Sequence, residues 1–166
     1  KEHQLKFQFS SYPAKSNIER MITINEDSIN LLKECNSGCK SATNSMEQVM
    51  PFITDERLKN LINEYNDKHI KIGDKCHQLL NEFHEDEKDP PAMAKAFSWI
   101  STEIKLMMND DTHKIADLMI DGCNMGIKSV SEYINKYKNA SGEIVELAKD
   151  LVKIEQDFMN DLLEFL

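Results

Sequence analysis

The sequence contains few of the residues that interrupt regular structure. It has 5 Gly, 4 Pro and 7% aromatic residues in 166, while 30% of its residues are charged. This balance disfavours an all-β fold, which needs many turns, and favours amphipathic helices. No apolar run approaches the roughly 18 residues of a membrane-spanning helix. We therefore expect helices and no membrane span.

Basic residues are also in deficit. The chain has 20 Lys+Arg against 29 Asp+Glu, a formal net charge of −9, whereas nucleic-acid-binding domains usually carry a basic patch. The cysteines lack the dense, even spacing of a secreted disulfide scaffold, and no signal-peptide pattern precedes them. We therefore expect no nucleic-acid partner, reduced thiols and a cytoplasmic location.

The length is typical of one domain, and a chain of this size can fold without disulfides or a metal. Residues 1–24 have no regular pattern and predict an N-terminal arm or tail. Residues 25–166 predict the folded domain. Within it, apolar residues recur every three or four positions in four segments, which is typical of amphipathic helices. We expect these helices at 26–50, 55–83, 112–137 and 142–165, with Asn25, Thr54, the run 109–111 and Ser141 supplying the N-caps.

The connections between these helices predict the topology. The first and last links are only a few residues long, so each joins an antiparallel hairpin. The middle link, residues 84–110, has a helical pattern of its own over 92–108, which at 1.5 Å per residue spans roughly 25 Å. Such a link can return the chain along the bundle. The sequence therefore predicts an all-α, ferritin-like four-helix bundle of two antiparallel hairpins joined by a long, helix-containing crossover.

An internal repeat agrees with this topology. Residues 35–41 (CNSGCKS) and 123–129 (CNMGIKS) are identical at five of seven positions. Gly38 and Gly126 occupy equivalent places in the two segments. Since Gly costs about 1 kcal/mol relative to Ala inside a helix, we expect both glycines to lie where another helix approaches closely.

These features carry a resemblance. The hairpin–crossover–hairpin layout, the Cys-Asn-x-Gly segments at Cys35 and Cys123, and the crossover containing Trp99 resemble an uncharacterised family of bacterial ferritin-like proteins over residues 25–166. The resemblance implies a ferritin-like bundle whose relatives often keep carboxylates in the middle of their helices.

The ligand set of a di-iron centre is missing from the sequence. Such bundles use Glu-x-x-His on two helices, and none of the five His residues has a Glu three positions before it. Glu155, in the last helix, is followed by Phe158 where the pattern requires His. Two Asp-x-x-His pairs, at His77 and His113, are interpreted as surface or capping groups.

A second kind of metal site is the alternative. Cys35, Cys39, His69 and Cys123 are placed on apolar helix faces, and thiolate and imidazole ligands suit zinc or another borderline-soft metal. The simpler interpretation treats these cysteines as small core residues and His69 as a partly buried core histidine bonded to a neighbour such as Tyr65 or a carboxylate. If His69 lacks a charged partner, its replacement by Leu should be roughly neutral at pH 7.5.

The sequence thus favours a non-catalytic ferritin-like module that acts through self-association or a protein partner. No catalytic residue and no cofactor is predicted. The alternative is a metal-binding or redox protein that uses residual carboxylates or the Cys/His cluster, with Zn or Fe as the cofactor. Because the 92–108 helix is apolar on more than one face, we expect a homodimer.

Overall fold

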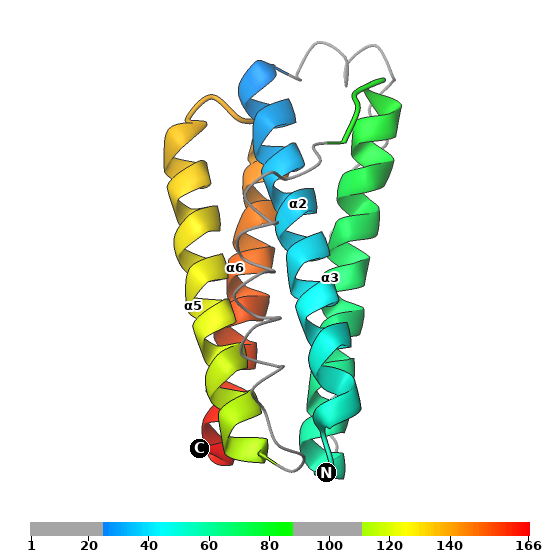
Figure 1. Ribbon diagram of the computed structural model, residues 1–166. Helices are drawn as coiled ribbons and strands as arrows, with labels where there is room; N and C mark the ends of the chain where they lie inside the picture. The colour runs from blue at the N-terminus through cyan, green and yellow to red at the C-terminus, as the bar shows by residue number, and fades with distance from the viewer. Residues whose placement is uncertain (1–24, 88–110) are drawn as a thin grey trace, which may run out of the picture.

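The computed structural model describes residues 25–87 and 111–166, which form an all-α bundle of four long helices (Figure 1). The helices are α2 (Glu26–Val49), α3 (Glu56–Glu82), α5 (Thr112–Lys136) and α6 (Gly142–Leu162). Two short 3₁₀ turns, η1 (Met50–Phe52) and η2 (Leu163–Phe165), follow α2 and α6. The expected arm over residues 1–24 and the expected helix over 92–108 lie outside the described residues.

The helices pair as two antiparallel hairpins, α2 with α3 and α5 with α6, as the link lengths predicted. Figure 1 also shows that α3 and α5 run in the same direction. The end of α3 and the start of α5 therefore lie at opposite ends of the bundle. The hairpins meet where α2 packs on α5 and α6, and where α3 packs on α6.

Side chains cap the N-termini of three of the helices. The side chain of Asn25 accepts the Ser28 N–H at 2.9 Å, and that of Asp111 accepts the Lys114 N–H at 3.0 Å. The prediction for α3 was wrong by one residue, since Asp55 and not Thr54 is its N-cap. The Asp55 carboxylate accepts two backbone N–H groups, at 2.8 and 3.2 Å, and its charge also complements the positive end of the helix dipole.

The buried face of α6 differs from the predicted one at two positions. The three-and-four spacing of apolar residues puts Leu147 and Ile154 on one face with Leu151 and Phe158, which predicts that all four are in the core. Leu147 and Ile154 are only partly buried, while Ala148 and Glu155 are buried in their place. A helix turns 100° per residue, so the face set by Leu151 and Phe158 includes position 155 whatever residue stands there. The prediction followed side-chain apolarity and missed a buried carboxylate.

The core consists of two apolar clusters with a polar pair between them. One cluster includes Val49, Ile62 and Phe158, and the other includes Leu31, Leu80 and Leu151. His69 and Glu155 belong to neither cluster, although both are buried. His69 and Glu155 therefore form a polar layer between the two clusters, where α3 faces α6.

Candidate functional site: a buried histidine–glutamate pair

Both ring nitrogens of His69 are engaged within the protein. His69 is 0% exposed. Its Nδ1 lies 2.7 Å from the carbonyl oxygen of Tyr65, one turn earlier in α3, and its Nε2 lies 3.1 Å from Oε1 of Glu155 in α6. A carbonyl oxygen can only accept a hydrogen bond, so Nδ1 carries a proton and donates it.

With Nδ1 protonated, the contact between His69 and Glu155 has two possible proton arrangements. One proton lies between Nε2 and Oε1, and it belongs either to an imidazolium facing a carboxylate or to a carboxylic acid facing a neutral ring. Glu155 is 7% exposed, so both partners are shielded from water. The arrangement suits a fixed internal hydrogen bond that joins the two hairpins, since neither group faces solvent.

Helix α5 supplies the surroundings of the Glu155 carboxylate. The Cys123 thiol is hydrogen-bonded to it, and burial together with this carboxylate holds the pKa of Cys123 far above its usual range. Gly126 lies against the same group, because a Cβ atom at this position would be 2.8 Å from Oε1. The close approach predicted for Gly126 is thus to a side chain. At Gly38 the nearest atom to such a Cβ is Leu151 Cδ2 at 3.9 Å, an ordinary contact.

Tyr65 extends the polar contacts between α3 and α6. Its hydroxyl donates to Oδ2 of Asp161 at 2.6 Å, and its ring stacks on Phe158 with the centroids 4.5 Å apart. Burial and the Asp161 hydrogen bond raise the pKa of the Tyr65 hydroxyl. Since the carbonyl of Tyr65 also holds His69, this residue orients the imidazole and anchors α3 against α6.

The four residues predicted as metal ligands are divided among the two clusters and the polar pair between them, although Cys39 and His69 line one pocket between α2 and α3. Cys35 and Cys39 lie with Cys76 in the cluster that contains Leu31, whereas Cys123 lies in the other cluster beside Glu155. His69 lies between the clusters with both nitrogens engaged. Within residues 25–87 and 111–166, no three His, Cys, Asp or Glu side chains are grouped so that they could hold a metal ion.

All four thiols should resist alkylation in the folded protein. Burial raises the pKa of Cys76 to about 12 and holds the pKa of the other three thiols well above its usual range. At pH 8, a thiol with a pKa near 12 is ionised in roughly one molecule in ten thousand, and the thiolate is the reactive form. We expect mass spectrometry to find little iodoacetamide adduct without denaturant and four adducts in guanidinium chloride. Rapid alkylation of any one thiol in the native protein would contradict this burial.

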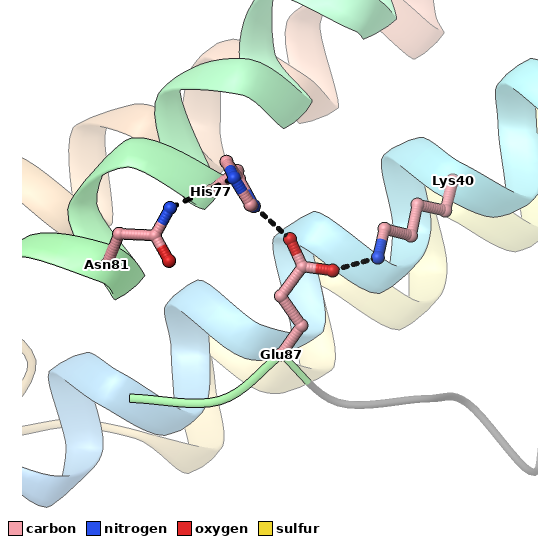
Figure 2. A network of polar contacts seen from close by, with 4 residues as sticks. All are labelled: Lys40, His77, Asn81 and Glu87. Carbon is pink, nitrogen blue, oxygen red and sulfur yellow. Dashed lines mark hydrogen bonds and ion pairs between the residues drawn. The ribbon is translucent and has the colours of Figure 1, made fainter. Parts of the chain in front are cut away.

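A second group of polar residues lies on the outer side of the α2–α3 hairpin. The carboxylate of Glu87 contacts both Lys40 Nζ and His77 Nδ1, as Figure 2 shows. These two donors lower the pKa of Glu87. On the far side of the ring, the Asn81 amide lies 2.9 Å from His77 Nε2. The amide donates to Nε2, so a neutral His77 can present its Nδ1 proton to the carboxylate.

The end of α3 brings Glu87 to this position. His84 adopts a left-handed conformation with φ 57°. The Glu85 N–H bonds to the Leu80 carbonyl, and the His84 N–H bonds to the Asn81 carbonyl. This is the Schellman pattern, which ends a helix and turns the chain away from its axis. The chain then contacts α2, where Glu85 pairs with Lys33 at 2.8 Å.

The sequence did not identify Glu155 or Glu87 as residues that form specific contacts. The signal for Glu155 was its position between Leu151 and Phe158 on one helix face. Glu85 and Glu87 follow the end of α3, and both form ion pairs with α2. No periodic pattern could indicate this, since the two residues follow the helix and their partners lie about 50 positions earlier.

Comparison with known proteins supports an all-α four-helix domain, and it supports the fold alone. No protein-family model and no curated protein matches the chain. Its structure is similar to the crystal structure of a DUF305 fragment from Deinococcus radiodurans, with a TM-score of 0.69 and 10% sequence identity. The match covers 84% of this chain and 95% of that one. In the part of the chain that the structure describes, no helix is long and apolar enough to cross a membrane.

Proposed function

We propose that the chain is a ferritin-like, non-catalytic helical module that acts through self-association or a protein partner. The observation that carries this proposal is the closed bonding of His69, the buried residue in the middle of the bundle. Each ring nitrogen of His69 already has a partner within the protein. A histidine bonded in this way has no nitrogen left for a metal ion and none for a substrate proton. The metal-binding alternative therefore receives no support from the geometry.

The ferritin-like part of the proposal is supported by the direction of the helices. Since α3 and α5 run in the same direction, a long connection must join opposite ends of the bundle. One long crossover between two antiparallel hairpins is the ferritin-like connectivity. In place of a di-iron centre, the middle of this bundle holds the pair of His69 and Glu155.

Exposed apolar side chains support an interaction surface. Leu163, which begins η2, and Leu166, which follows it, are 53% and 51% exposed and lie on either side of the buried Phe165 in the sequence. Residues three apart in a 3₁₀ turn lie on the same side. Neighbouring exposed apolar groups are typical of contacts with another protein chain.

Light scattering at tens of micromolar should give the mass of a homodimer. A double substitution, Leu163→Ser with Leu166→Ser, should shift this mass toward the monomer. The matched control is Met125→Ser, which changes an equally exposed side chain on α5 and should leave the mass unchanged. A monomeric wild-type protein contradicts self-association, and stoichiometric zinc or iron in the same sample, by elemental analysis, contradicts the module proposed here.

A further inference from the structure

A groove of about 350 Å³ lies between α2 and α3, on the side where Glu87 is held. Its volume is within the range of small-molecule sites. Lys40, His77 and Glu87 line it together with Asn36 and Gly73. At Gly73 the two helices approach closely, because a Cβ atom there would lie 3.3 Å from Cβ of Cys39.

The groove contains an unused hydrogen-bond donor. Asn36 is 1% exposed, and its amide nitrogen, Nδ2, has no hydrogen-bond partner. Buried polar groups are nearly always hydrogen-bonded, and an exception calls for an explanation. Asn36 is one helical turn before Lys40 in α2, so the two side chains lie on the same face. An oxygen atom of a bound molecule would complete the bonding of Asn36.

The entrance of the groove already binds a carboxylate. Lys40 from α2 and His77 from α3 both donate to Glu87 (Figure 2). Two converging donors, one of them charged, form an anion-binding site. Glu87 belongs to the chain that follows α3 and not to either helix that forms the groove. The carboxylate of a separate molecule can therefore take the same position between Lys40 and His77.

An acidic residue in the groove limits which further groups a bound carboxylate molecule can carry. Asp74, one turn before His77 in α3, is a second acidic residue in the lining. A second negative charge on the ligand would be repelled by this side chain, whereas Asn36 needs only a neutral acceptor. A ketone, amide or hydroxyl oxygen meets both conditions.

We propose that the groove between α2 and α3 binds a small monocarboxylate that carries a second, neutral oxygen acceptor. Its carboxylate takes the place of the Glu87 carboxylate between Lys40 and His77, and its second oxygen accepts a hydrogen bond from Asn36 Nδ2. Glu87 thus acts as an internal competitor that closes the site when no ligand is bound. This site is separate from the surface proposed above for self-association and does not depend on it.

Two probes that differ by one oxygen atom test the proposal. The probes are 4-oxopentanoate and pentanoate, titrated into the full chain at pH 7 with binding followed by NMR chemical shifts. Glu87→Gln should bind 4-oxopentanoate about 10-fold more tightly than the wild type, because the competing carboxylate is gone. In the Glu87→Gln background, Lys40→Met should weaken binding of both probes about 10-fold, since the cation that holds the carboxylate is lost.

Two further variants separate the site from a general loosening of the chain after α3. In the Glu87→Gln background, Asn36→Ala should reduce the affinity for 4-oxopentanoate to that for pentanoate. Lys33→Met removes the neighbouring ion pair with Glu85 and should change neither affinity. Equal binding by the wild type and Glu87→Gln, or full affinity retained by the Lys40→Met variant, would overturn the proposal. Lys40 is exposed, so its replacement should not prevent folding. The affinity of the Lys40→Met variant can therefore be measured even if the Asn36 variant does not fold.

Discussion

Replacing His69 by leucine is expected to lower the free energy of unfolding by about 3–5 kcal/mol at pH 7.5, because the Glu155 carboxyl is left buried without its imidazole partner. The sequence alone predicted a roughly neutral effect for a histidine without a charged partner. The contact of 3.1 Å between Nε2 and Oε1 changes that expectation. Urea denaturation of the wild type and the variant, monitored by circular dichroism, measures the difference.

The double variant His69→Leu with Glu155→Met should unfold within about 1 kcal/mol of the wild type, since replacing both partners of a buried pair by apolar groups is often neutral or stabilising. The conservative change Glu155→Gln should cost about 1 kcal/mol, because the amide can donate to Nε2 of a neutral His69. As a control, Lys153→Ala breaks an exposed ion pair with Asp157 on the same helix and should cost about 0.5 kcal/mol or less. If the double variant loses as much stability as the two single changes added together, the pair is not the source of the effect.

Alanine substitutions at two glycines of α5 should change stability in opposite directions. Gly126→Ala is expected to destabilise the protein by about 1–3 kcal/mol, because its Cβ would displace the Glu155 carboxylate that His69 holds. Gly122→Ala is expected to stabilise it by about 0.5–1 kcal/mol, since Ala is the better helix residue and a Cβ there meets no atom within 4 Å.

Thermal unfolding of the two alanine variants beside the wild type measures both effects. The pair forms its own control, because each variant adds one methyl group to the same helix four residues apart. Combining Gly126→Ala with Glu155→Gln should cost less than the two changes added together, since both disturb the same contact. An increase in the unfolding temperature of Gly126→Ala would show that Glu155 can move aside freely.

The sequence predicted the helices well because each has an amphipathic pattern and most have a local start signal. Asn25 caps α2 as expected, the cap of α5 is Asp111 from the predicted run 109–111, and the short links predicted both hairpins. Helical periodicity also placed His69 in the core, where it is 0% exposed. The predicted bonding to Tyr65 or to a carboxylate is confirmed, since the ring contacts both the Tyr65 carbonyl and Glu155.

What the sequence did not reveal depends on contacts between distant segments. Glu155 is separated from His69 by 86 positions, and the apolarity of Leu147 and Ile154 masked the face to which it belongs. Glu87 was missed for a different reason, because the left-handed conformation of His84 directs the chain back to α2. That conformation is uncommon for a residue other than glycine, so the sequence contained no standard turn signal.

The pairing of helices also has a consequence for how the chain folds. Contacts within each hairpin join residues closer in sequence than those between hairpins, so their loop-closure entropy is smaller and each hairpin is the less costly unit to form. When the two hairpins dock, α3 and α6 have to adopt one alignment along the bundle axis. Apolar side chains alone tolerate a shift of one helical turn, whereas the hydrogen bond between His69 and Glu155 and that between Tyr65 and Asp161 are satisfied in a single alignment. The polar layer thus gives the bundle a unique register at the step where its two halves meet.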